Sequence, residues 1–205
     1  MKYIIIGHYG SGKSEIAINL AMNMGIKTIV DLDIVNPYFR TSDVKNQMKQ
    51  FGIDVIASEF ASSNIEVPAL PARINSVFDQ DIDAIFDVGG DGEGATVLGR
   101  YAEKFGDVYE MIMVVNAKRP LTSTKKQIEE MMAEIEYASK LKITKVINNT
   151  NLLEQSNIED LLAAEEILEG FTNVWKISGF ANVMDKLPKK YDDKKLVLER
   201  RIFYS

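Results

Sequence analysis

Residues 7–14 of this 205-residue chain have the types and spacing needed to bind phosphate. The segment Gly7-His8-Tyr9-Gly10-Ser11-Gly12-Lys13-Ser14 fits the pattern G-x-x-x-x-G-K-[ST] at every fixed position. In this pattern, backbone N–H groups surround the phosphates of a nucleotide, and the positive end of the following helix dipole faces the same anion. The predicted nucleotide-binding residues lie in the loop and the first helical turn: Gly7, Gly10, Ser11, Gly12, Lys13, Ser14 and Glu15.

Lys13 and Ser14 are predicted to take the two most specific roles in this loop. The Lys13 amine would reach the β- and γ-phosphates and act in catalysis, and the Ser14 hydroxyl would ligate Mg²⁺. His8, the single histidine of the chain, lies inside the loop. We expect it to shape the outside of the loop, and a catalytic imidazole is the alternative.

Carboxylates follow two of the predicted strands. The second strand ends in Asp31-Leu32-Asp33. These aspartates either terminate the strand in a turn or, as we favour beside a phosphate-binding loop, serve a metal ion (Asp31) and the attacking water (Asp33). The fourth strand ends in Asp87-Val88-Gly89-Gly90. This segment predicts that Asp87 lies on the metal side and that the Gly90 N–H contacts the third phosphate.

The segment Asn148-Asn149-Thr150-Asn151, after a late strand, bears on the choice of base. An N-K-x-D motif, whose aspartate pairs with guanine, is absent from the chain. An asparagine amide offers a donor and an acceptor that suit the edge of adenine. We therefore predict that Asn149 contacts adenine, and an asparagine-rich turn is the alternative.

Two basic residues, Lys118 and Arg119, follow the fifth predicted strand. One interpretation is a solvated basic turn ahead of a helix. The other is contact with a phosphate or with an acidic substrate. The sequence favours neither interpretation.

An alternating series of strands and helices must position these residues. Short apolar runs predict strands at residues 2–6, 27–31, 54–57, 84–88, 109–116, 142–148 and 173–177. Longer amphipathic stretches predict helices at residues 13–24, 42–51, 68–80, 95–105, 122–141, 158–169 and 195–201. The alternation predicts an α/β fold with a mostly parallel central sheet of about seven strands, helices on both faces, and one domain over residues 1–205.

Ligands of such a sheet bind beyond the C-terminal ends of its strands. Three loop-like stretches are expected on that side, at residues 36–42, 61–71 and 89–94. Within the last of them, residues 91–94 are rich in glycine and are expected to form a mobile loop.

Composition excludes several classes of function. The 30 acidic residues outnumber the 24 Lys and Arg residues, and the net charge of −6 argues against direct nucleic-acid binding. The chain has no cysteine, which excludes disulfides and thiolate catalysis and favours a cytoplasmic location. No apolar stretch approaches the ~20 residues of a membrane span. The basic and apolar residues 194–204 are expected to pack on the domain, and a membrane-touching helix is the alternative.

Taken together, these motifs resemble the SIMIBI class of P-loop NTPases, particularly the ATPases of the CobQ/CobB/MinD/ParA group. The resemblance depends on the phosphate-binding loop, the pair Asp31 and Asp33, Asp87-Val88-Gly89-Gly90, and Asn149. It implies ATP and ADP as ligands and Mg²⁺ as cofactor. It also implies that Asp33 positions the attacking water and that Asn149 contacts adenine.

His8 stands where MinD/ParA-type ATPases carry the signature lysine of their sandwich dimer. A neutral imidazole lacks both the reach and the permanent charge of an ammonium group. The resemblance therefore does not imply a standard ATP-driven dimer, and it leaves a homodimer as an open alternative.

Two functions compete on this basis. The first is an ATPase that acts as a nucleotide-driven switch or regulates a partner. The alternative is an ATP-dependent small-molecule kinase or ligase similar to dethiobiotin synthetase and CobQ-type enzymes. Its substrate would lie between residues 36–40 and 66–71, with Arg40, Arg73 or Arg119 binding an anionic group. A protein that binds ATP without hydrolysing it is disfavoured by Asp33 and Asp87.

Overall fold

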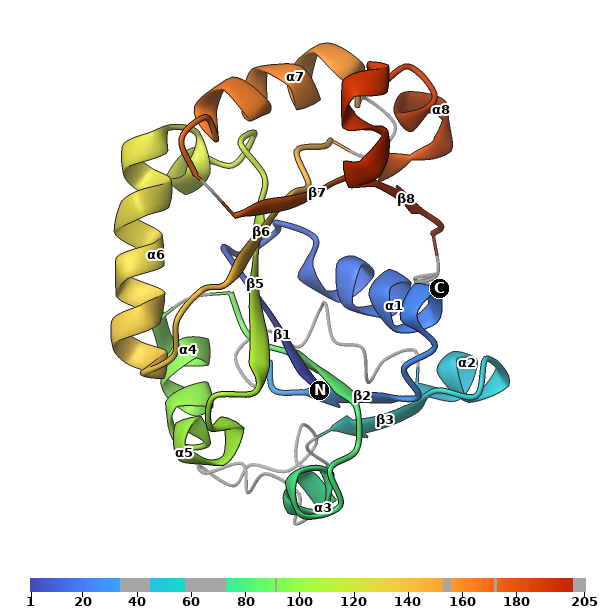
Figure 1. Cartoon of the computed structure of the whole chain (residues 1–205), viewed down its shortest axis with the longest axis vertical. Coiled ribbons are helices and arrows are strands. Elements are labelled where there is room, and N and C mark those ends of the chain that lie inside the picture. Colours follow the sequence, from blue (N-terminus) through green and yellow to red (C-terminus); the bar gives the residue numbers. More distant parts are fainter. Residues whose placement is uncertain (34–44, 58–72, 91, 153–155, 172, 201–205) are drawn as a thin grey trace, which may run out of the picture.

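The computed structural model describes residues 1–33, 45–57, 73–90, 92–152, 156–171 and 173–200. Eight strands form one sheet in the order β3-β2-β4-β1-β5-β6-β7-β8, and each pairing between neighbours is parallel (Figure 1). The strands are β1 (Lys2–Ile6), β2 (Thr28–Asp31), β3 (Asp54–Ala57), β4 (Ala84–Asp87), β5 (Tyr109–Val115), β6 (Lys145–Asn148), β7 (Val174–Phe180) and β8 (Lys195–Leu198). The predicted α/β fold with a parallel sheet is confirmed, with β8 as an additional strand.

Helices cover both faces of this sheet (Figure 1). They are α1 (Lys13–Met24), α2 (Lys45–Gln50), α3 (Arg73–Asp79), α4 (Gly92–Gly99), α5 (Ala102–Phe105), α6 (Lys125–Ser139), α7 (Ile158–Ile167) and α8 (Ala181–Met184), with 3₁₀ turns η3 (Pro120–Thr122) and η5 (Lys189–Lys194). Among the described residues, no helix combines the length and the apolar character that a membrane span requires.

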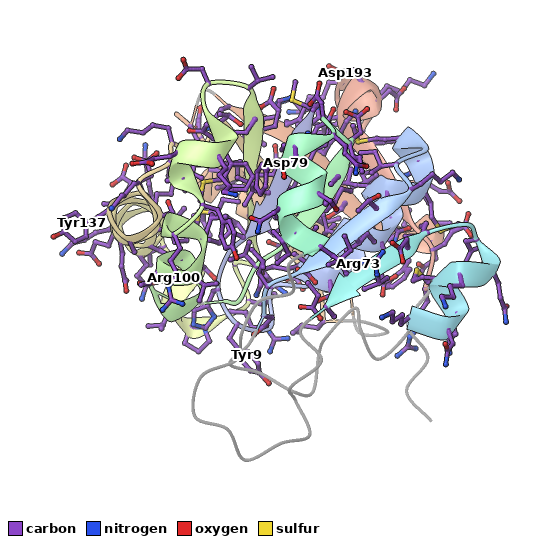
Figure 2. The ribbon with its side chains drawn as sticks, turned by 90° about the horizontal axis from the view of Figure 1, so that it is seen from below. Tyr9, Arg73, Asp79, Arg100, Tyr137 and Asp193 are labelled. Atoms are coloured by element: carbon purple, nitrogen blue, oxygen red, sulfur yellow. The ribbon has the colours of Figure 1, made fainter. Side chains whose placement is uncertain are left out.

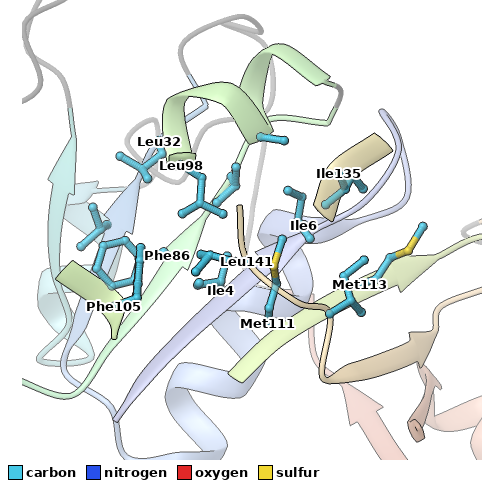
Figure 3. Packing of buried hydrophobic residues seen from close by; sticks show 14 of the residues in the cluster. Ile4, Ile6, Leu32, Phe86, Leu98, Phe105, Met111, Met113, Ile135 and Leu141 are labelled. Atoms are coloured by element: carbon cyan, nitrogen blue, oxygen red, sulfur yellow. The ribbon is translucent and has the colours of Figure 1, made fainter. Parts of the chain in front are cut away.

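The core divides into two apolar layers because successive side chains of a strand point to opposite faces. In β1, Ile5 joins the layer that contains Ile16 and Leu20 of α1. Ile4 and Ile6 join the opposite layer, which contains Leu98 of α4 together with Ile128 and Ile135 of α6; Figure 3 shows part of this layer. β1 is therefore buried on both faces, and the loop that follows it is anchored in the centre of the fold.

Three local expectations were wrong. The helix expected at residues 195–201 is absent from its described part, residues 195–200, because Lys195–Leu198 pair with β7 as the edge strand β8. Val197 is 44% exposed between the buried residues Leu196 and Leu198, a period of two that suits a strand. The expected helix at residues 95–105 is divided into α4 and α5. The expected mobile loop at residues 91–94 overlaps the first turn of α4, which begins at Gly92.

Candidate functional site

The phosphate-binding loop connects the buried end of β1 to the start of α1. Gly7 and Gly12 have φ values of 146° and 90°, in a region that favours glycine. A Cβ on Gly7 would lie 2.3 Å from the carbonyl oxygen of Val114, and one on Gly12 would lie 2.3 Å from Asn149 Nδ2. The loop therefore needs glycine at both positions, for its backbone conformation and for its close packing against β5 and against Asn149, which follows β6.

Lys13 lies under this loop rather than in solvent. Its side chain is largely buried, and Nζ donates a hydrogen bond of 3.2 Å to the carbonyl oxygen of His8. A Cβ on Gly90 would lie 2.8 Å from Lys13 Nζ and 2.7 Å from the backbone nitrogen of Tyr9. The structure thus brings together Lys13 and Gly90, the two residues predicted to contact the terminal phosphate. The Tyr9 side chain is 51% exposed and projects outward from the loop (Figure 2).

The register of the sheet brings two of the predicted carboxylates together. β2 and β4 are neighbours, and Asp31 lies directly opposite Asp87. Both residues are buried, and Asp87 is only 1% exposed. Burial and the nearby Asp31 raise the pKa of Asp87 to about 8, although a hydrogen bond from Ser14 and the charge of Lys13 act in the opposite direction.

Two buried side-chain oxygens have no hydrogen-bond partner in the part of the chain that the structure describes. They are Ser11 Oγ and Asp87 Oδ2, and both belong to this site. Unpaired buried polar atoms are rare in folded proteins because they cost free energy. A ligand that supplies a donor or a positive charge at these atoms would remove that cost.

Ser14, Asp31 and Asp87 fit a Mg²⁺ ion that is bound together with a nucleotide. Within the described residues, no group of three or more His, Cys, Asp or Glu is arranged to hold a metal by itself. Mg²⁺ in nucleotide sites is commonly held by one or two protein oxygens together with phosphate oxygens and water. Ser14 and Asp87, which are joined by a side-chain hydrogen bond, offer such oxygens, and Asp31 lies beside them.

Asp33 lies beside Asp31 and beside the segment that follows β4. Its backbone N–H donates to Asp31 Oδ1 at 3.0 Å, which fixes the turn after β2. Asp33 Oδ1 would lie 3.2 Å from a Cβ on Gly89, so its carboxylate lies against the Gly89-Gly90 segment. Gly90, the next residue, lies beside Lys13 Nζ, where the terminal phosphate is expected.

Asn149 is buried and is bonded to three other parts of the protein. The side chain is 2% exposed, and Nδ2 donates to the carbonyl oxygen of Ser11 at 2.7 Å. Its Oδ1 accepts hydrogen bonds from Ser178 Oγ at 2.8 Å and from Asn151 Nδ2 at 3.0 Å. Asn149 thus connects the phosphate-binding loop to β6 and β7, and its contact with adenine stays a prediction. Ser178, a single small polar residue in a strand, gives no signal in the sequence.

The two basic residues after β5 have separate partners. Arg119 Nε donates to the carbonyl oxygen of Gly10 at 3.0 Å, whereas Lys118 forms an ion pair of 2.6 Å with Asp160 of α7. Arg119 therefore contacts the phosphate-binding loop, and Lys118 contacts α7. In α1, the Glu15 carboxylate accepts a hydrogen bond of 3.0 Å from Asn19.

The predicted substrate region gains no support from the described residues. Residues 36–40 and 66–71, including Arg40, lie outside them. Arg73 forms an ion pair of 2.6 Å with Asp54 of β3.

No protein-family model and no curated protein matches the chain. Among solved structures, it is similar to cell division protein FtsY from Thermotoga maritima, with a TM-score of 0.60 and 16% identity over 87% of this chain and 61% of that one. It is also similar to the signal recognition particle receptor FtsY from Elizabethkingia anophelis in complex with GDP, with a TM-score of 0.54 and 15% identity over 86% of this chain and 56% of that one. Chloroplast FtsY from Physcomitrella patens gives a TM-score of 0.57 and 13% identity over 86% of this chain and 57% of that one.

The chain spans about three fifths of the length of these proteins or less. At such low identities the likeness establishes the fold, which is that of the P-loop NTPases.

Proposed function

We propose that this protein binds a nucleoside triphosphate together with Mg²⁺ and hydrolyses it, acting as a nucleotide-driven switch or regulator of a partner. The observation that carries this proposal is the location of the two unpaired buried oxygens, Ser11 Oγ and Asp87 Oδ2. Ser11 belongs to the phosphate-binding loop, and Asp87 belongs to the carboxylate pair at the ends of β2 and β4. A bound phosphate and its cation would satisfy both atoms.

In this proposal each residue of the site has a separate task. Backbone N–H groups at the start of α1 bind the phosphates, and the Lys13 amine exchanges the His8 carbonyl for a phosphate oxygen. Asp33 orients the attacking water near Gly89 and Gly90. When bound, Mg²⁺ supplies charge neutralisation on the phosphates, and Ser14 and Asp87 would hold it.

ATP is the nucleotide that we propose. The four residues that end and follow β6, at positions 148–151, contain no carboxylate, and a carboxylate is the group that pairs with guanine in an N-K-x-D motif. The similar structure from Elizabethkingia anophelis contains GDP, which makes a guanine nucleotide the alternative. Both nucleotides must therefore be compared directly.

Helix α4 is the element best placed to respond to the third phosphate. It begins at Gly92, two residues after Gly90. A Cβ on Gly94 would lie 2.5 Å from the carbonyl oxygen of Gly89, so the first turn of α4 packs directly against the segment that follows β4. A phosphate contact at Gly90 would therefore act on the start of α4, which is the type of element that nucleotide switches move.

The proposal is tested by calorimetric titration of the full chain with Mg-ATP and with Mg-GTP. Wild-type protein is expected to bind Mg-ATP more tightly, and Lys13→Ala is expected to abolish tight binding. Lys142→Ala is the matched control, because Lys142 is an exposed lysine paired with Glu136. Binding that survives in Lys13→Ala would contradict the site, and a preference for GTP would contradict the choice of base.

A nucleotide-dependent homodimer needs a separate measurement. Sedimentation velocity of the full chain, alone and with a saturating non-hydrolysable ATP analogue, gives the oligomeric state in each condition. Because His8 replaces the signature lysine, we expect the same oligomeric state with and without the nucleotide. A dimer that forms only with the analogue would contradict this expectation.

A further inference from the structure

We propose that Arg119 is a positioning residue that holds the phosphate-binding loop in its binding conformation before the nucleotide arrives. This inference rests on the proposed function and adds a residue to its site. Arg119 Nε donates a hydrogen bond of 3.0 Å to the carbonyl oxygen of Gly10. The guanidinium also lies flat against the loop, because a Cβ on Gly10 would be 3.3 Å from both Cζ and Nε of Arg119.

The segment around Arg119 is itself held by hydrogen bonds, as expected of a rigid support. The backbone nitrogen of Arg119 donates to the carbonyl oxygen of Asn116 at 3.0 Å, and Thr122 Oγ1 donates to the same oxygen at 2.7 Å. Asn116 Oδ1 accepts from the backbone nitrogen of Lys118 at 3.0 Å. Pro120 restricts the preceding residue to extended backbone, and Arg119 has φ −95° and ψ 139°.

The hydrogen bond from Arg119 acts on one peptide plane of the loop. The carbonyl of Gly10 and the N–H of Ser11 belong to the same planar unit. The Gly10 oxygen of this unit accepts the hydrogen bond from Arg119. The Ser11 N–H of the same unit donates to the carbonyl oxygen of His8 at 3.1 Å. The plane is thereby fixed at both ends. A loop with three glycines at positive φ would otherwise sample many conformations, so fixing it in advance lowers the cost of binding phosphate.

Lys118 shows that this contact is specific to Arg119. The two residues are adjacent and carry the same charge, but Lys118 is paired with Asp160 of α7 at 2.6 Å. Lys118→Ala therefore removes the same charge from the same turn without removing a contact to the loop. It is the matched control for Arg119 variants.

The first measurement is the affinity of the full chain for Mg-ATP and Mg-GTP in three variants. In Arg119→Gln, the side-chain nitrogen occupies the same place along the side chain as Arg Nε, so this variant keeps the donor and removes the charge. We expect Arg119→Ala to weaken binding by about ten- to hundredfold, the range for loss of a charged hydrogen bond. Arg119→Gln is expected to recover part of this loss, because it keeps a neutral hydrogen bond, and Lys118→Ala to stay within about twofold of wild type.

The second measurement is amide hydrogen exchange of residues 7–14 in nucleotide-free protein. Arg119→Ala is expected to raise exchange in the loop, and Arg119→Gln and Lys118→Ala are expected to retain wild-type protection.

If wild-type protein binds neither nucleotide, the proposed function fails and the exchange experiment alone decides on Arg119. Exchange in Arg119→Ala equal to that in Lys118→Ala overturns the inference. Loss of affinity in both Arg119→Ala and Arg119→Gln with unchanged exchange also overturns it, because charge alone would then explain the loss.

Discussion

Asp87 is a residue that destabilises the nucleotide-free protein when it is ionised. Its carboxyl group is buried beside Asp31, and Oδ2 has no hydrogen-bond partner among the described residues. Burial and the charge of Asp31 therefore raise its pKa from 3.8 to about 8. Ionising a buried carboxyl group without a nearby cation costs free energy. Such groups are therefore rare in hydrophobic cores and common in binding sites.

This cost predicts a pH dependence of stability. The pKa of Asp87 in the folded protein lies above the ordinary aspartate value of 3.8, which applies to the unfolded chain. The stability of the fold is therefore highest, as far as Asp87 determines it, below about pH 4, and this stability is lost as the pH rises through about 8. In Mg²⁺-free buffer, Asp87→Asn is expected to gain stability relative to wild type across this interval, approaching roughly 5 kcal/mol. Urea unfolding at pH 5 to 9 measures the difference. The exposed Asp107→Asn is the control, and a difference that does not change with pH would contradict the shift.

Asp33 allows binding and turnover to be separated. Its carboxylate lies against Gly89, on the side expected for the attacking water, and its predicted role is confined to hydrolysis. Asp33→Ala is expected to retain nucleotide affinity and to lose turnover by roughly 10²-fold or more, the typical contribution of a positioned acid or base. Calorimetry and phosphate release measure the two properties separately. Hydrolysis at the wild-type rate in Asp33→Ala would remove Asp33 from the mechanism.

At the scale of elements, the sequence predicted the helices and strands whose bounds depend on neighbouring residues in the chain. The bounds of α1 and β3 agree with the expected ranges, because apolar spacing and flanking glycines define them within a few residues. Strand β8 was not predicted because this four-residue segment forms a strand through its pairing with β7, which is a tertiary contact. Likewise, Arg119 bonds a backbone carbonyl 109 positions away, and a carbonyl leaves no trace in the sequence.

The contact between α4 and α6 depends on a glycine. A Cβ on Gly99 would lie 2.6 Å from the carbonyl oxygen of Ala138, which the backbone of α6 holds in place. Gly99→Ala is therefore expected to lower the free energy of unfolding by about 1–3 kcal/mol, despite the better helix propensity of alanine. Urea unfolding measures this, with Thr96→Ala at an exposed position of α4 as the control. A stabilised Gly99→Ala protein would show that the two helices can move apart freely.

At the scale of the whole molecule, the first helix is bonded to the residue that follows the last described strand. Asn19 of α1 accepts a hydrogen bond from the backbone nitrogen of Glu199 at 2.9 Å and donates to its carbonyl oxygen at 3.1 Å. Glu199 directly follows β8, so residues 180 positions apart in sequence meet at the same edge of the fold. The phosphate-binding loop is likewise bonded to distant segments, through Arg119 after β5 and Asn149 after β6. We therefore expect the chain to unfold as one unit.

Trp175, the only tryptophan, makes this expectation measurable. It lies in β7, where the Lys145 amine is 4.7 Å from its ring, so its fluorescence reports the outer strands while far-UV circular dichroism reports all elements. The two signals are expected to give the same urea midpoint. A saturating nucleotide at a hundredfold its Kd should stabilise both transitions by about 2.7 kcal/mol, although Trp175 lies outside the site. An earlier fluorescence transition that the nucleotide leaves unchanged would mean that β7 and β8 form a separate folding unit.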